Sequence, residues 1–420
     1  MTDRNLALDP ARLNRRRFLA VASGATLTAI LAACGGSKAT DTPGSAGGTV
    51  APATATTSGG ATASATGAAS SVAAGNNKPT PTAINDTAPA TVNPAQTRAA
   101  AASTTSASSA VVATTTGGTQ KITVMLDWVP NTNHTGLYVA QAKGYFKEVG
   151  LDAEILPLAE GGSLEQIVGN GKVQFGISSS ESLAKARSEG IPIVSIAPII
   201  QHNTSGFSSL KKANIARPKD FEGKRYASFG SATEKALIGR LMQSDGGDVG
   251  KVEFVETGDA DFLTLAQKGQ VDFAWVFEGW EVIDGKLRGL DLYYLPLTNY
   301  TKVVPDYYTP IYIAGEEIIA KSPGVVGKFL AAVSKGYNDA IADPKGVGDI
   351  LAKATPETSK ELIQQSQQYL AKQYKADAPR WGDQKPEVWQ NFATFMTEQK
   401  LLAKPFDPTK AFTTQFLPKS

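Results

Sequence analysis

Cysteine is almost absent from this chain: Cys34 is the only one among 420 residues. A single cysteine excludes intramolecular disulfides and every cysteine-rich metal site. Histidine is nearly as scarce, and neither His134 nor His202 stands in the spacing of a metal-binding motif. The sequence therefore predicts no metal centre.

Sequence motifs of catalysis are missing as well. The chain has no Walker-type phosphate loop, no dinucleotide-binding glycine fingerprint and no Gly-x-Ser-x-Gly nucleophile elbow. A Ser-His-Asp set stays open, because such a set is assembled in space rather than along the sequence. This inventory is thin for a globular part of this size. It predicts a protein that is not an enzyme and carries no cofactor.

An excess of charge of either sign is also lacking. The formal net charge is +2, and the first 33 residues alone carry +3 from five arginines and two aspartates. The rest of the chain is therefore close to neutral, at −1. Such a balance gives no electrostatic case for nucleic-acid binding.

The N-terminal segment has the order of features found in an exported lipoprotein. Arg15–Arg17 precede Phe18-Leu19, as in a twin-arginine signal, and the apolar run that follows is too short for a stable membrane span. It ends in Leu31-Ala32-Ala33-Cys34, which resembles a lipobox. We predict a signal peptide at residues 1–33, lipidation of Cys34, and an anchored protein that faces outward from the cell membrane. A buried structural cysteine in a signal-like helix is the alternative.

Residues 34–119 are low in sequence complexity. Ala, Thr, Ser, Gly and Pro dominate them, with few charges and no apolar periodicity. Such a segment cannot bury enough apolar surface to offset the entropy lost on ordering. We expect a disordered tether between the membrane and a globular part at residues 120–420, and its many hydroxyls leave O-glycosylation open.

Short apolar runs alternate with helical patterns throughout residues 120–420. Strands are expected at 121–126, 151–156, 173–177, 191–200, 224–228, 252–255, 271–277 and 290–295. Helices are expected at 163–168, from Ser180 or Glu181, at 232–244, at 262–267, and from Pro323 nearly to the end. This alternation predicts an α/β fold with parallel sheets covered by helices on both faces, and the two strand series predict two lobes.

The turn after the first expected strand is the leading candidate for a ligand site. Pro130 ends the extended run, and Thr132 or Asn133 can cap the helix that follows. Ligands of α/β proteins bind at such turns, where helix N-termini and loop side chains meet. The turn offers Trp128, Asn131 and His134, which suit a flat, hydrogen-bonding ligand. A tight turn with the Trp packed beneath it is the alternative.

Three further stretches contain candidate ligand contacts. Ser178, Ser179, Ser180 and Glu181 join a strand to a helix, where hydroxyls and free N–H groups can hold a polar group; an ordinary helix cap is the alternative. Glu278 and Trp280 follow an expected strand, so a carboxylate and a stacking ring stand at its ligand-binding end. Tyr307 and Tyr308 stand at an expected crossing between the lobes, where they can also simply pack.

Two stretches of the chain resemble a known family. Asp127–Gly136, which reads DWVPNTNHTG, and Ala142–Leu151, which reads AKGYFKEVGL, are similar to segments of ABC-importer substrate-binding proteins related to thiamine-pyrimidine-precursor synthases. The resemblance covers roughly residues 120–400. It implies a type II periplasmic-binding-protein-like clamp that closes on its ligand, with crossings near 202–208 and 305–312. Lobe 1 would hold about 120–204 plus 309–420, and lobe 2 about 205–308.

The family contains branches with different activities and ligands. Its eukaryotic synthases consume an active-site His and carry a Cys-rich motif that this chain lacks, so the resemblance favours an importer component. Importer branches bind either riboflavin or thiamine pyrimidine precursors, such as formylaminopyrimidine or hydroxymethylpyrimidine. The lipoprotein signal and the Thr/Ser/Ala-rich tether resemble the riboflavin branch most.

We therefore expect a lipoprotein that captures riboflavin and delivers it to an ABC permease with its ATPase subunits. Trp128 and Trp280 would stack on the ring, and Glu278 and Asn131 would bond its edge. The remaining candidates, Ser178–Glu181 and the Tyr307-Tyr308 pair, would close over the tail. The alternatives are binding of a thiamine pyrimidine precursor, an exported enzyme that acts on a heterocycle through His134, and a structural lipoprotein.

Overall fold

The computed structural model describes residues 118–158, 163–258 and 260–419. The predicted signal peptide, Cys34 and the tether up to residue 117 lie outside the described residues. Within these three ranges, no helix is both long enough and apolar enough to cross a membrane.

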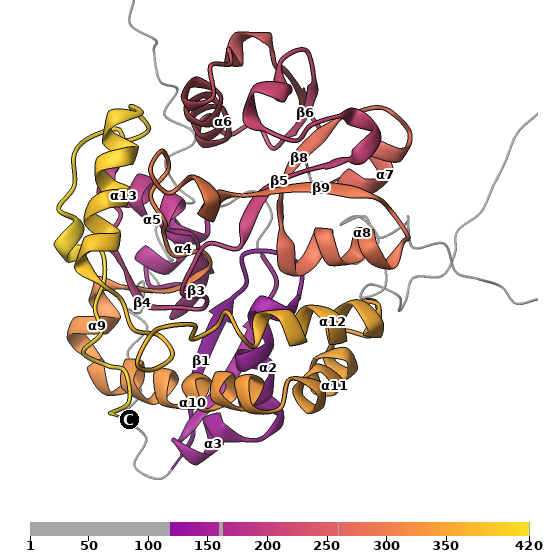
Figure 1. Cartoon of the computed structure of the whole chain (residues 1–420). Coiled ribbons are helices and arrows are strands. Elements are labelled where there is room, and N and C mark those ends of the chain that lie inside the picture. Colours follow the sequence, from indigo (N-terminus) through magenta and orange to yellow (C-terminus); the bar gives the residue numbers. More distant parts are fainter. Residues whose placement is uncertain (1–117, 159–162, 259, 420) are drawn as a thin grey trace, which may run out of the picture. The chain divides into compact units, whose positions relative to one another are not determined.

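The first lobe is built on a five-stranded sheet with the order β2-β1-β3-β10-β4 (Figure 1). Its strands are β1 (Gln120–Met125), β2 (Leu151–Leu156), β3 (Phe175–Ser178), β4 (Ile193–Pro198) and β10 (Ile311–Gly315). Its helices are α2 (Thr135–Ala142), α3 (Tyr145–Glu148), α4 (Leu164–Gly169), α5 (Ser180–Ser188), α9 (Glu316–Lys321), α10 (Pro323–Ala342), α11 (Pro344–Ala354) and α12 (Lys360–Leu370). The lobe thus combines chain from before and after the second lobe.

The second lobe is built on another five-stranded sheet, with the order β7-β6-β8-β5-β9. Its strands are β5 (Ser205–Leu210), β6 (Arg225–Ser228), β7 (Glu253–Glu256), β8 (Phe273–Phe277) and β9 (Leu292–Pro296). Its helices are α6 (Ala232–Ser244), α7 (Phe262–Gln267) and α8 (Ile283–Leu287), and a π-helical turn, η7 (Glu278–Val282), joins β8 to α8.

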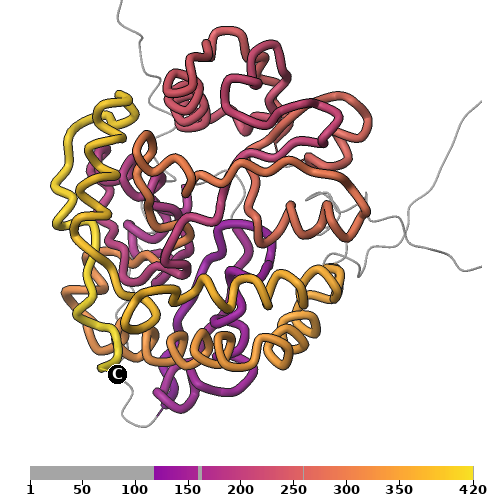
Figure 2. The backbone as a smooth tube through the Cα atoms, viewed as in Figure 1, coloured from indigo at the N-terminus to yellow at the C-terminus, as the bar shows by residue number. Residues whose placement is uncertain are grey.

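Both sheets are mixed, which differs from the predicted parallel sheets. β10 runs antiparallel to β3 and β4, and β5 runs antiparallel to β8 and β9. These two strands adjoin the two passages of the chain between the lobes, after β4 and before β10 (Figure 2), and neither was expected as a strand. β5 reads Ser-Gly-Phe-Ser-Ser-Leu and so carries little β-propensity. Its burial between two neighbouring strands decides its conformation, because tertiary context overrides propensity in sheets.

Other local expectations are met more closely. β2, α6 and α7 begin and end at the expected residues. The first helix differs, because a short 3-10 turn, η3 (Thr132–His134), precedes α2 and is capped by Asn131 rather than by Thr132 or Asn133. The C-terminal part is also less helical than expected: residues 371–385 and 399–419 separate or follow the helices there.

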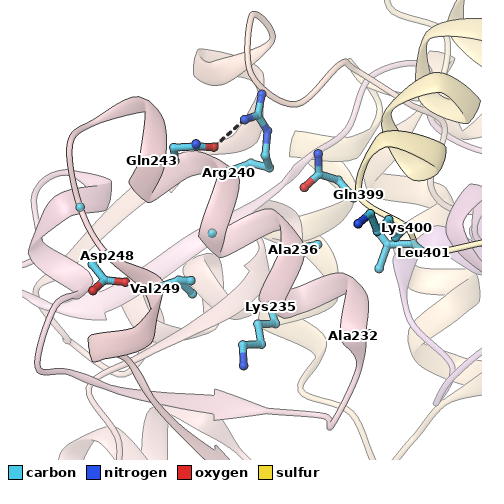
Figure 3. Close-up of a pocket in the computed structure, with 12 residues that line it drawn as sticks. Ala232, Lys235, Ala236, Arg240, Gln243, Asp248, Val249, Gln399, Lys400 and Leu401 are labelled. Carbon is cyan, nitrogen blue, oxygen red and sulfur yellow. Dashed lines mark hydrogen bonds between the residues drawn. The ribbon is translucent and has the colours of Figure 1, made fainter.

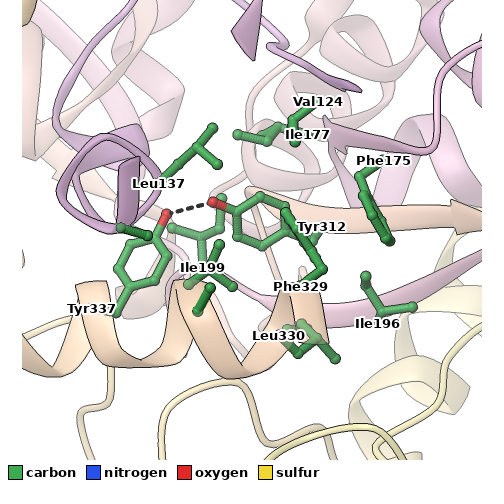
Figure 4. Close-up of a cluster of buried hydrophobic side chains, with 14 of the residues drawn as sticks. Val124, Leu137, Phe175, Ile177, Ile196, Ile199, Tyr312, Phe329, Leu330 and Tyr337 are labelled. Carbon is green, nitrogen blue, oxygen red and sulfur yellow. Dashed lines mark hydrogen bonds between the residues drawn. The ribbon is translucent and has the colours of Figure 1, made fainter. Parts of the chain in front are cut away.

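The core of the first lobe lies between its sheet and the long helix α10. Phe329 of α10 stacks on Phe175 of β3, with 3.9 Å between ring centroids. The hydroxyls of Tyr312 and Tyr337 lie 3.1 Å apart and form a hydrogen bond in this core (Figure 4). A Cβ at Gly136 of α2 would lie only 2.3 Å from the Tyr337 ring. Because α2 packs this closely on α10, the turn that leads into α2 is held firmly.

Helix α13 (Pro386–Glu398) packs against both lobes. Its Trp389 belongs to a buried cluster that includes Tyr308 and strands of the first lobe, whereas Phe392 belongs to a cluster of the second lobe with Phe207. The Phe392 ring also stacks on Tyr307, with 4.2 Å between ring centroids. The second passage between the lobes is therefore covered by this helix.

Candidate functional site

Strand register places the candidate residues at one edge of each sheet. In the first lobe, Ser178 at the end of β3 and Pro198 at the end of β4 both pair with Ile311, which comes directly from the second passage. In the second lobe, Phe277 at the end of β8 pairs with Ser205, which comes directly from the first passage. The strand ends of both sheets therefore lie on the side of the passages. We call the two edges that carry Asp127, Trp128, Glu278 and Trp280 the interlobe face.

His134 and Asp127 form a hydrogen-bonded pair in the turn after β1. His134 Nε2 lies 2.8 Å from Asp127 Oδ1, and His134 Nδ1 accepts the Asn131 backbone N–H at 3.2 Å. A nitrogen that accepts an N–H carries no proton, so the imidazole is neutral and donates from Nε2 to Asp127. His134 is fully buried, whereas 30% of the Asp127 side chain is exposed. The Asp127 carboxylate is thus partly exposed, and the buried His134 imidazole holds its orientation through the hydrogen bond from the interior.

Asn131 is hydrogen-bonded within the same turn. Its Oδ1 accepts the Asn133 N–H at 2.8 Å, its Nδ2 donates to the Val129 carbonyl at 3.0 Å, and the residue is 4% exposed. Trp128 is half-buried next to it and stacks on no aromatic ring among the described residues. Sequence reasoning missed Asp127 as a candidate, although its position directly after an apolar strand and before Trp128 is the signal that could have found it.

The predicted serine cluster is hydrogen-bonded to the protein. Ser178 Oγ donates to Glu165 Oε1 at 2.6 Å, and Ser180 Oγ donates to the Tyr308 carbonyl at 2.6 Å. Ser179 caps α5 by accepting the Ser182 N–H at 3.1 Å. These three hydroxyls connect α4, α5 and the second passage, so their present role is to hold the elements together.

Glu181 and Tyr307 come together in the interior beside the second passage. Burial raises the pKa of Glu181, and burial followed by the nearby Glu181 carboxylate raises the pKa of Tyr307 well above its usual range. Glu181 Oε2 and the Tyr307 hydroxyl have no hydrogen-bond partner among the described residues. Tyr308 is also buried, and its hydroxyl accepts the Lys385 N–H at 3.0 Å. Both tyrosines thus pack under α13.

Glu278 occupies the interlobe face at the end of β8. Its Oε2 accepts the hydroxyl of Tyr369, on α12 of the first lobe, at 3.0 Å. Its backbone N–H donates to the Thr204 carbonyl at 2.9 Å, and the Tyr294 hydroxyl donates to the same carbonyl at 2.8 Å. The residue begins the π-helical turn η7. Such turns are rare in proteins overall, but many of those known lie at functional sites.

Trp280 and Glu281 lie in the same turn. Trp280 is half-buried, as Trp128 is. Glu281 Oε2 accepts the Phe277 N–H at 2.9 Å, and burial raises the pKa of Glu281 to about 7. The structure therefore groups Glu278 and Trp280 at the interlobe face, whereas Asn131, His134, Tyr307 and Tyr308 are turned into the protein.

A separate groove lies elsewhere on the second lobe. It has a volume of about 700 Å³ and is lined by α6 and by residues 399–401, after α13 (Figure 3). Arg240 donates to Gln243 at 2.7 Å on one side of it, while Lys235 points away from Leu401. Its lining residues are not at strand ends and its charged groups do not converge. We therefore place the candidate site at the interlobe face and not in this groove.

Solved structures with the same architecture include solute-binding proteins. The periplasmic aliphatic sulphonate binding protein SsuA from Escherichia coli matches with a TM-score of 0.57 and 14% identity, over 71% of this chain and 94% of that protein. A ligand-binding component of an ABC-type import system from Staphylococcus aureus matches with a TM-score of 0.55 and 16% identity, over 71% of this chain and 97% of that protein. At these identities the likeness establishes the fold: a two-lobed periplasmic-binding-protein clamp, as predicted.

Relatives of known name include both a binding protein and enzymes. The formylaminopyrimidine-binding protein of Halalkalibacterium halodurans is 26% identical over 301 residues, which are 70% of this chain and 89% of that protein. A 4-amino-5-hydroxymethyl-2-methylpyrimidine phosphate synthase of Saccharomyces cerevisiae is 28% identical over 242 residues, 54% of this chain and 68% of that protein. A synthase of the same name from Legionella pneumophila is 24% identical over 71% of this chain and 92% of that protein.

These relatives correct one expectation and establish the family. The prediction that the chain is not an enzyme is contradicted, because several of its relatives are named as synthases. The absence of these sequence motifs is therefore no ground for excluding an activity. The profile described as NMT1/THI5 like matches residues 131–347, which is more than half of the chain. The chain belongs to the NMT1/THI5 like family.

Proposed function

We propose that this chain captures a thiamine pyrimidine precursor of the formylaminopyrimidine type, as the solute-binding component of an importer. The observation that carries the proposal is that a carboxylate stands next to a half-buried indole at a strand end of each lobe, Asp127 beside Trp128 and Glu278 near Trp280. The relative named as a formylaminopyrimidine-binding protein supports the ligand class.

An aminopyrimidine suits this set of groups chemically. Its exocyclic amino group donates hydrogen bonds, which carboxylates accept with charge assistance. Its flat ring can stack on an indole, and a buried stacking contact is worth about 1 kcal/mol beyond the buried area. Neutral His134 fixes the Asp127 carboxylate, so less side-chain entropy is lost on binding.

Riboflavin, the ligand expected from the sequence, is the second candidate. Its ribityl hydroxyls would need polar partners, and the predicted ones were Asn131, Ser178–Ser180 and Glu181. The side chains of Asn131 and the three serines already bond to the protein, which favours a ligand without a polyhydroxyl tail. Glu181 is buried beside the second passage.

Delivery to a permease with ATPase subunits belongs to the same proposal. The fold of the import-system component from Staphylococcus aureus supports it. We also propose that Cys34 carries a lipid that holds the chain outside the cell membrane. Mass spectrometry of membrane fractions, with Cys34→Ser as the control, tests the anchor independently of the ligand.

Isothermal titration with formylaminopyrimidine, hydroxymethylpyrimidine and riboflavin tests the ligand. We expect binding of a pyrimidine and its loss in Asp127→Asn and Glu278→Gln. Asp152→Asn and Glu253→Gln change exposed carboxylates on β2 and β7 and serve as matched controls. Binding of riboflavin alone would overturn the proposed ligand. Because the family includes synthases, the titrated samples are also analysed by mass spectrometry, and conversion of the compound would replace capture with catalysis.

A further inference from the structure

Tyr369 of α12 reaches from the first lobe to Glu278 of the second. Its hydroxyl donates to Glu278 Oε2 at 3.0 Å. Burial, followed by the nearby Glu278 carboxylate, raises the pKa of the Tyr369 hydroxyl well above its usual range. The phenol therefore keeps its proton, and one acceptor oxygen of Glu278 already has a donor.

Helix α12 holds Tyr369 in place from the first lobe. Ser366 Oγ lies 2.5 Å from Thr132 Oγ1, and Gln367 Oε1 accepts the Thr135 hydroxyl at 2.7 Å. Tyr374, which follows the helix, donates to the Thr132 carbonyl at 2.6 Å. These bonds tie the helix to the turn that carries Asp127 and Trp128, so Tyr369 and that turn form one rigid group.

The second lobe packs closely against Tyr369 at Gly279. A Cβ built at Gly279 would lie 3.0 Å from Tyr369 Cδ1 and 3.2 Å from Leu370 Cδ2, so η7 approaches α12 closely and any larger residue would require one of these side chains to shift. α12 lies beside α8 as well as η7 (Figure 1). The contact between the lobes is thus tight on both sides of the Tyr369–Glu278 hydrogen bond.

We propose that Tyr369 is a specificity-determining latch, which joins the lobes through Glu278 and competes with the ligand for that carboxylate. This inference rests on the proposed role of Glu278 in ligand binding. A ligand N–H group that approaches the lone pair of Oε2 used by the phenol must displace the phenol, whereas a ligand that only stacks gains nothing from doing so. The latch therefore favours ligands with a strong donor and holds the lobes together until one binds.

Ligand affinity measures the competition. Tyr369→Phe keeps the ring and removes the hydroxyl, so pyrimidine affinity should rise about tenfold, the amount typical of one lost competing hydrogen bond. Tyr145→Phe is the matched control, because Tyr145 donates to Asp339 at 2.6 Å within the first lobe. Unchanged or weaker pyrimidine binding in Tyr369→Phe would overturn the competition.

The distance between the lobes, measured without any ligand, tests whether the Tyr369–Glu278 hydrogen bond joins them. The whole chain with Cys34→Ser, Lys328→Cys on α10 and Lys268→Cys after α7 carries one spin label on each lobe, at exposed positions. Electron–electron double resonance should show a longer or broader distance distribution in Tyr369→Phe than in Tyr145→Phe. Identical distributions would overturn the latch. If no pyrimidine binds but the distribution still broadens, the proposed ligand fails and the latch stands.

Discussion

The double contact of His134 allows its two ring nitrogens to be tested separately. The Nδ1 accepts the buried Asn131 N–H and the Nε2 donates to Asp127. In His134→Asn the side-chain oxygen can take the place of Nδ1, and in His134→Gln the side-chain amide can take the place of Nε2. The two variants therefore keep one contact each.

We expect the variants to separate stability from binding. His134→Gln leaves the Asn131 N–H without an acceptor, which should lower the free energy of unfolding by about 1–3 kcal/mol. It keeps a donor on Asp127, so pyrimidine affinity should stay within about threefold of the wild type. His134→Asn should be the more stable variant, but the unsupported Asp127 carboxylate should lower affinity by about tenfold, the cost of one charge-assisted hydrogen bond.

Urea unfolding and isothermal titration of both variants provide the measurement. Equal stabilities would show that the Asn131 contact does not depend on the ring. Equal affinities, with binding intact in both, would refute the role of His134 in orienting Asp127. Because each variant is the control for the other, a general loss of packing at this buried position cancels in the comparison.

Three further outcomes follow from the structure. Trp128→Ala should weaken pyrimidine binding by about 2 kcal/mol, or thirtyfold, in the same titration, and undiminished affinity would place the ring elsewhere. Gly279→Ala should destabilise the protein to urea by about 1–3 kcal/mol because its Cβ would crowd Tyr369, whereas Gly327→Ala, with nothing within 4 Å of its Cβ, should be neutral or slightly stabilising. The hydrogen bond to Asp306, and after it the one to Asp377, raises the pKa of His202 from its ordinary 6.5 to about 9. Charged His202 then stabilises the fold fully below pH 6.5, and this stability is lost as the pH rises to about 9. Since 43% of the side chain is exposed, the loss in free energy of unfolding should be only about 1 kcal/mol. Urea titrations below pH 6.5 and above pH 9 measure this loss, which should be absent in His202→Gln. An equal loss in both proteins would contradict the role of His202.

Local pattern was sufficient for much of the fold. β2, α6 and α7 begin and end where the sequence predicts, because apolar periodicity and capping residues such as Ser231 act within a few residues of the element they define. The strand-to-turn position of Trp128 and the position of Glu278 after β8 follow from the same local signals. The sequence by itself therefore determined the two α/β series and the ends of the strands where candidate residues collect.

Tertiary structure decided which side chains remain free for a ligand. Ser178 and Ser180 are polar in sequence, but their hydroxyls donate to partners that only folding brings near, Glu165 and the Tyr308 carbonyl. β5 became a strand through its neighbours and not through its propensity. Tyr369 lies 91 residues from Glu278 along the chain, so no local pattern could pair them. The physical reason is common to all three cases: a hydrogen-bonding group is satisfied by whichever partner the fold places within reach, and sequence separation does not limit that choice.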